Sequence, residues 1–122
     1  MKKILFIEDE PALQKAIGEL LTNEGYEVIK ALDGETGLNL AKKEKPNLIL
    51  LDLILPKKDG FEVLAELKQS PETKDIPVII LTNLERATDV EKALELGANT
   101  YLVKANYTLQ EVVEKVKNAL KE

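Results

Sequence analysis

The chain has 122 residues, enough for one domain with a substantial apolar core and too few for two. It contains neither cysteine nor histidine, which excludes disulfides, thiolate chemistry and the usual zinc ligands, and which fits a reducing compartment such as the cytoplasm. The net charge of −5 argues against direct binding to nucleic acid, and no apolar run approaches the roughly 20 residues of a membrane-spanning helix.

Five apolar runs of strand length are spread along the chain. Four are nearly continuous, as expected for parallel strands buried on both faces, and the second alternates with polar residues, as expected at the edge of a sheet. The runs are KILFI (3–7), YEVIKA (26–31), NLILLDL (47–53), PVIIL (77–81) and TYLVK (100–104).

A helical pattern follows each of these runs, with signals for where the helix begins or ends. Pro11 suits the first turn of the first helix, and Gly97 suits the end of the fourth. Asp59 is a predicted N-cap, and Thr108 with Glu111 has the spacing of a capping box. The predicted helices span residues 11–25, 34–45, 59–69, 85–97 and 108–120.

Five strand–helix units in succession predict an α/β fold. Right-handed crossovers place helices on both faces of a parallel sheet, and the polar second strand belongs at an edge. We therefore predict one domain over residues 1–122, a doubly wound (βα)5 fold with a five-stranded parallel sheet in the flavodoxin-like order 2-1-3-4-5.

Polar residues follow several of the predicted strands. Asp52 interrupts an apolar run, where an unpaired carboxylate costs several kcal/mol. The carboxyl ends of parallel strands share one edge of the sheet, so other polar residues that follow strands should lie near Asp52. These are Glu8, Asp9, Glu10, Thr82 and Lys104. Taken singly they have simpler interpretations as cap or surface residues, and Glu10 before Pro11 suits a helix start.

The joint pattern indicates a site for a phosphoryl group. Crowded carboxylates repel one another unless a cation lies among them, and without histidine or cysteine that cation is a hard one, most simply Mg²⁺. Lys104 adds a second positive charge and Thr82 adds a hydrogen-bond donor, which leaves Asp52 as the nucleophile.

The sequence closely resembles the receiver domain of bacterial-type two-component response regulators, including the single-domain ones of chemotaxis. The resemblance covers the whole chain and rests on four motifs in register: ILFIEDEP, LLDLILPKKDG, PVIILT and GANTYLVKA. It implies a phosphoacceptor switch and not an enzyme. The phosphoryl group would come from a phosphohistidine on a histidine kinase or a phosphotransfer protein.

The resemblance also implies roles for single residues. Asp52 matches the phosphoacceptor, Lys104 the cation that pairs with acceptor and phosphate, and Thr82 the switch hydroxyl. Tyr101 matches the switch aromatic, although a tyrosine that simply packs on the last helix is an equal alternative. The implied ligands of Mg²⁺ or Mn²⁺ are Glu8 (through water), Asp9, Asp52 and the backbone carbonyl of Ile54. A downstream protein would bind the fourth helix, fifth strand and fifth helix.

Two positions depart from the family pattern. Glu8 stands where Asp is commoner, and Ala105 stands where a proline nearly always follows the lysine through a cis peptide bond. A cis bond before a residue other than proline costs about 2.5–4 kcal/mol. We therefore predict a trans Lys104–Ala105 bond, a rearranged loop before Thr108, and a Lys104 amine that still reaches Asp52.

Other functions are disfavoured or stay open. The segment EDEPAL lacks the glycine-rich loop of nucleotide- or flavin-binding domains, and Ile54 stands where haloacid-dehalogenase-type phosphatases have a second Asp. A receiver-like module that binds a partner without phosphorylation stays open, as does an engineered receiver scaffold. The chain is either a stand-alone regulator or a domain of a longer one.

Overall fold

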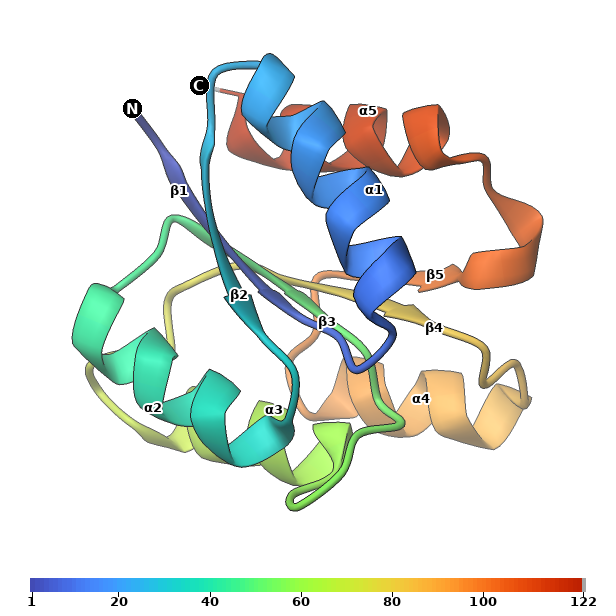
Figure 1. Cartoon of the computed structure of the whole chain (residues 1–122). Helices are drawn as coiled ribbons and strands as arrows, with labels where there is room; N and C mark the ends of the chain where they lie inside the picture. Colours follow the sequence, from blue (N-terminus) through green and yellow to red (C-terminus); the bar gives the residue numbers. More distant parts are fainter. Residues whose placement is uncertain (122) are drawn as a thin grey trace.

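A five-stranded parallel sheet forms the centre of the molecule, with helices on both of its faces (Figure 1). The computed structural model describes residues 1–121. The strand order is β2-β1-β3-β4-β5 and every neighbouring pair is parallel, so the predicted doubly wound fold and its order are confirmed. The strands are β1 (Lys3–Ile7), β2 (Glu27–Ala31), β3 (Leu48–Leu51), β4 (Val78–Thr82) and β5 (Thr100–Val103).

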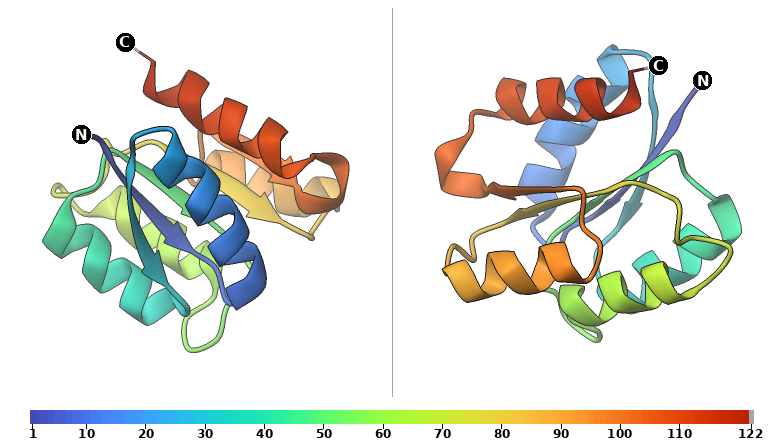
Figure 2. Two further views of the ribbon diagram at one scale, coloured as in Figure 1. Left: turned by 45° about the horizontal axis from the view of Figure 1, so that its top comes forward. Right: turned by 180° about the vertical axis from the view of Figure 1, so that it is seen from behind.

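Each strand leads into a helix that crosses one face of the sheet. The helices are α1 (Pro11–Asn23), α2 (Gly34–Glu44), α3 (Gly60–Gln69), α4 (Ala87–Glu95) and α5 (Leu109–Leu120), with a 3-10 turn η1 (Lys104–Asn106) before α5. Helices α1 and α5 cover one face, and α2, α3 and α4 cover the other, as Figure 2 shows from two further sides. Among residues 1–121, no helix combines the length and the apolar character needed to cross a membrane.

The predicted helix starts are confirmed at Pro11, in the first turn of α1, and where a capping side chain is present. The Asp59 carboxylate accepts a hydrogen bond from the N–H of Glu62 at 3.1 Å, and Thr108 and Glu111 form both bonds of a capping box. Helix α4 begins two residues later than predicted, because Arg86 is extended and makes no side-chain capping bond in the described structure.

Alternate residues of the strands face opposite layers of helices, which explains why the apolar runs are continuous. Ile4, Phe6, Leu48, Leu50, Ile79 and Leu81 pack with the apolar residues of α1 and α5. Leu5, Ile7, Ile49, Leu51, Val78 and Ile80 pack with those of α2, α3 and α4.

The pairing of β1 with β3 positions the polar residues that follow these strands. Ile7 lies opposite Leu51, and the N–H of Asp52 donates to the carbonyl oxygen of Ile7 at 3.0 Å. Strand β3 ends at Leu51, earlier than the predicted run, so Asp52 is the first residue after the strand. Gly60 approaches this segment closely, since a Cβ atom there would lie 2.4 Å from the carbonyl oxygen of Asp52. Only glycine fits beneath the Asp52 segment in this backbone arrangement.

Candidate phosphoacceptor site

Glu8 and Asp52 are buried carboxylates side by side at the carboxyl edge of the sheet. Their exposed fractions are 0% and 3%, respectively. Glu8 Oε2 accepts a hydrogen bond from the N–H of Glu10 at 3.1 Å, and Asp52 Oδ1 accepts one from the N–H of Ile54 at 3.1 Å. Two adjacent buried carboxylates are unfavourable unless they share a cation.

Lys104 supplies that cation from the opposite end of the sequence. Its ammonium lies 2.9 Å from Asp52 Oδ2, 2.7 Å from Glu10 Oε1 and 3.1 Å from Glu8 Oε1. No peptide bond among residues 1–121 is cis, and the residue after Lys104 continues into the 3-10 turn η1. The predictions of a trans Lys104–Ala105 bond and of a lysine that still reaches Asp52 are confirmed.

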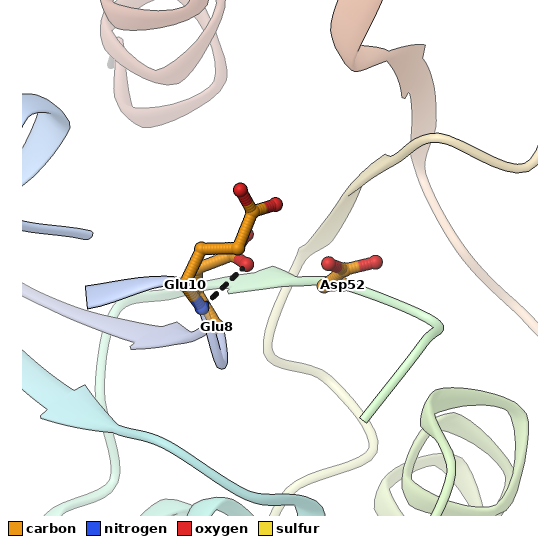
Figure 3. A group of neighbouring side chains, drawn as sticks. All are labelled: Glu8, Glu10 and Asp52. Carbon is orange, nitrogen blue, oxygen red and sulfur yellow. Dashed lines mark hydrogen bonds between the residues drawn. The ribbon is translucent and has the colours of Figure 1, made fainter. Parts of the chain in front are cut away.

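Glu10 is the functional candidate that the sequence interpretation undervalued. Its place before Pro11 suits the start of α1, and it does occupy the N-cap position, but its side chain makes no capping bond in the described structure. Instead its carboxylate joins those of Glu8 and Asp52, with one oxygen of each within 4.8 Å of the others (Figure 3). A third acid in the run EDE was the available signal.

Asp9 and Ile54 occupy different places from these three acids. Asp9 is exposed and lies outside the converging group found among residues 1–121. The Ile54 side chain is 51% exposed, while its backbone N–H is held by Asp52. The structure thus brings Glu8, Asp52 and Lys104 together and leaves the Asp9 side chain at the surface.

Thr82 and Tyr101 are linked through one residue of the loop after β4. Thr82 is fully buried, and its hydroxyl oxygen accepts a long hydrogen bond, 3.5 Å, from the N–H of Leu84. The Tyr101 hydroxyl donates to the carbonyl oxygen of Leu84 at 2.8 Å. Burial, followed by the nearby charges of Asp89 and Asp52, raises the pKa of Tyr101 to about 12, so it remains a donor at neutral pH.

The site is short of positive charge. Burial, and next the charge of Asp52, raises the pKa of Glu8 from 4.5 to about 7, although hydrogen bonding to Lys104 opposes this rise. Burial disfavours the charged form of Lys104, but hydrogen bonds to Glu10, Asp52 and Glu8 outweigh it and raise the pKa of the ammonium. Lys104 therefore remains charged, while Glu8 ionises less readily than an ordinary glutamate.

The donor set fits a hard divalent cation. Three carboxylates face a single ammonium, and Glu8 Oε1 is buried without a hydrogen bond from any residue in 1–121. The Lys104 ammonium lies 3.1 Å from this oxygen but donates its hydrogen bond to the other oxygen, Oε2, at 3.2 Å. Oxygen ligands of this kind suit Mg²⁺ and Mn²⁺, whose charge would compensate the excess of carboxylates.

The family model described as "Response regulator receiver domain" matches residues 4–117. The chain belongs to this family. Receiver domains are the parts of two-component response regulators that are phosphorylated on an aspartate, and they bind Mg²⁺ or Mn²⁺ at their acidic pocket. The predicted family, its phosphoacceptor function and its metal are thereby confirmed.

Relatives and solved structures agree with this assignment. The DNA-binding dual master transcriptional regulator RpaA of Synechocystis is 40% identical over 121 residues, which cover 99% of this chain and 50% of RpaA. The Mn²⁺-bound form of the response regulator Rcp1 has a TM-score of 0.88 and 39% identity, over 99% of this chain and 96% of Rcp1. The phosphorylated cyanobacterial phytochrome response regulator RcpA has a TM-score of 0.83 and 37% identity, over 97% of this chain and 90% of RcpA.

The chain spans about half the length of the curated relatives that it matches. By contrast, this chain covers almost the whole length of structural neighbours such as Rcp1.

Proposed function

We propose that Asp52 is the aspartate that accepts the phosphoryl group in this receiver domain. The observation that supports this most directly is the contact of the buried Asp52 carboxylate with Lys104, at 2.9 Å. Asp52 also directly follows β3, next to β1, at the point where ligands bind in doubly wound sheets.

The transfer step then uses the residues around Asp52. One carboxylate oxygen of Asp52 attacks the phosphorus of a partner's phosphohistidine; an O–P bond forms while the N–P bond breaks, and the imidazole nitrogen keeps the electron pair. Lys104 stays beside the acceptor and compensates the negative charge that arrives. The Thr82 hydroxyl, at the end of β4, donates a hydrogen bond to a phosphoryl oxygen.

The proposed metal-binding groups are Glu8, Asp9, Asp52 and the backbone carbonyl of Ile54. Glu8 and Asp52 are supported by their convergence and by the buried Glu8 oxygen that accepts no hydrogen bond from residues 1–121. Support for Asp9 comes from the sequence motif, since its side chain is exposed here. When bound, Mg²⁺ or Mn²⁺ supplies Lewis-acid stabilisation of the phosphoryl oxygens.

We further propose that phosphorylation is transmitted from Thr82 to Tyr101 through Leu84. The bond from the Leu84 N–H to the Thr82 hydroxyl oxygen is long, so it restrains the hydroxyl only weakly, and the hydroxyl hydrogen can be donated to a phosphoryl oxygen. Leu84 also holds the Tyr101 hydroxyl through its carbonyl oxygen. A shift of Thr82 thereby changes the packing of Tyr101, a residue of β5, and of the adjoining helices α4 and α5. A downstream protein binds to the surface that α4, β5 and α5 form.

These assignments define a regulator with protein partners. The donor is a histidine kinase or a phosphotransfer protein, as in receiver domains generally. The net charge of −5 favours protein over nucleic acid as the direct partner of this chain. We propose that residues 1–122 form one receiver domain that works in the cytoplasm and acts as a phosphoacceptor and not as an enzyme.

The test is intact mass spectrometry after incubation with acetyl phosphate and Mg²⁺. Wild type should gain one phosphoryl group and Asp52→Asn should gain none. Asp75→Asn, the same change at an exposed loop position, is the matched control and should be labelled like wild type. Labelling of Asp52→Asn as complete as that of wild type would overturn the assignment.

A further inference from the structure

Glu10 makes the shortest contact of the Lys104 ammonium. The distance is 2.7 Å, against 2.9 Å to Asp52 and 3.1 Å to Glu8. The three carboxylates differ in burial, since the Glu10 side chain is 57% exposed while those of Glu8 and Asp52 are 0% and 4% exposed. Figure 3 shows the Glu10 side chain extending past that of Glu8, with its carboxylate farthest from the sheet.

The backbone of Glu10 is fixed independently of this contact. Its N–H donates to Glu8 Oε2 at 3.1 Å, and the next residue, Pro11, has a restricted φ at the first position of α1. The Glu10 side chain makes no capping bond within the described structure, so helix capping does not explain its direction. The remaining explanation for that direction is the ion pair with Lys104.

Lys104 needs such a partner whenever the inner acids are occupied. Its side chain is only 11% exposed, so the ammonium cannot rely on water alone for solvation. A divalent cation at Glu8 and Asp52 would repel an ammonium placed on the same oxygens. Glu10 offers a carboxylate on the outer side of the site, which keeps the ammonium close to Asp52 without using the oxygens of Asp52.

We propose that Glu10 is a positioning residue, the outer counter-ion that holds Lys104 beside Asp52 while the inner carboxylates take up metal and phosphoryl oxygens. The inference rests on the proposed role of this site. It assigns Glu10 a function through Lys104 and not as a ligand of the metal.

A double-mutant cycle in Mg²⁺ affinity tests this role. The Kd for Mg²⁺ is measured from amide chemical shifts for wild type, Glu10→Gln, Lys104→Met and the double variant. Glu10→Gln should weaken Mg²⁺ binding by about fivefold more when Lys104 is present than when it is methionine, as expected for contacting charges. If Glu10→Gln weakens Mg²⁺ binding by the same factor with Lys104 and with methionine at position 104, Glu10 acts as a direct metal ligand or through its general charge. That result would overturn the proposal.

Two further variants separate the contact from the charge. Glu10→Asp keeps the charge but shortens the side chain, so it should behave like Glu10→Gln; an affinity equal to that of wild type would overturn the proposal. Glu19→Gln makes the same charge change at an exposed position of α1 and should alter the Kd less than about twofold. Phosphorylation of Asp52→Asn would refute the proposed function, whereas an additive cycle would refute only the role of Glu10.

Discussion

The raised pKa of Glu8 predicts that this residue destabilises the metal-free protein at alkaline pH. Glu8 is fully buried, and its pKa lies at about 7 in the fold against 4.5 ordinarily, mainly because burial disfavours its charged form. The folded protein therefore binds this proton more tightly than the unfolded chain does. The associated stability is fully present below pH 4.5 and is lost as the pH rises through 7.

Replacement of Glu8 by glutamine removes this dependence on pH. Each pH unit between the two pKa values is worth about 1.4 kcal/mol, so most of the effect falls between pH 5 and pH 8 and amounts to about 2–3 kcal/mol. Glutamine cannot ionise, so the stability of Glu8→Gln lacks this dependence. From pH 5 to pH 8, the free energy of unfolding of Glu8→Gln should therefore rise by about 2–3 kcal/mol relative to that of wild type. At pH 5 the two proteins should differ by about 1 kcal/mol or less.

Urea unfolding followed by circular dichroism, in buffer with EDTA at pH 5 and pH 8, measures the difference. Other ionisable groups are common to both proteins, so their contributions largely cancel. Glu19→Gln on the surface of α1 is the control, and its free energy of unfolding should differ from that of wild type by the same amount at both pH values. If the difference in free energy of unfolding between Glu8→Gln and wild type stays constant, or shrinks toward pH 8, the reasoning is refuted.

Four further predictions concern the metal, the switch and the backbone. Mg²⁺ should raise the melting temperature of wild type, and Asp52→Asn should lose most of that gain, because the ion binds only the assembled site. Thr82→Ala should still be phosphorylated, but amide shifts around Tyr101 on binding of a phosphoryl analogue should be smaller. Lys57→Asn should raise the free energy of unfolding by about 0.5–1 kcal/mol, since Lys57 has a φ of 69° and asparagine tolerates this region better. Gly60→Ala should lower it by about 3 kcal/mol, because the added Cβ would meet backbone atoms at 2.4 Å.

Each of these predictions has a result that contradicts it. A full Mg²⁺ gain in Asp52→Asn would mean that the metal binds without Asp52. Undiminished shifts around Tyr101 would show that Thr82 does not carry the signal. Lys74→Asn, at an exposed lysine without positive φ, is the control for Lys57→Asn, and equal stabilisation of both would refute the strain argument. Wild-type stability of Gly60→Ala would show that the Asp52 segment moves easily.

The fold was predictable because its signals are local. Continuous apolar runs mark strands covered on both faces, and the alternation in 26–31 predicted the edge position that β2 occupies. Helix starts were predictable at Asp59 and Thr108, where a side chain caps the helix, and at Pro11, where proline occupies the first turn, but not at α4, which has neither signal. The limits of β3 were harder to predict, since Asp52 and Leu53 are buried like strand residues but lie outside the ladder.

The site was predictable in its membership more than in its side-chain directions. Parallel topology brings strand ends together whatever the side chains do, which is why Glu8, Asp52 and Lys104 meet as expected. The direction of Glu10 depends on Lys104, which is 94 positions away in the sequence. Of three consecutive acids after a strand, no local pattern tells which side chains turn toward the site, so neither the outward direction of the Asp9 side chain nor the contact of Glu10 with Lys104 was predictable.

The burial of Asp52 among leucines is explained by the charge balance of the site. One ammonium is enough to let the acids fold together, yet it leaves Glu8 Oε1 without a hydrogen bond and the carboxylates in excess. A phosphoryl group adds further negative charge, so its transfer to Asp52 is favourable only together with added positive charge. Dependence on a divalent cation is therefore a consequence of how few cations this chain places around Asp52. A second lysine in the pocket would stabilise the resting protein and would weaken that dependence.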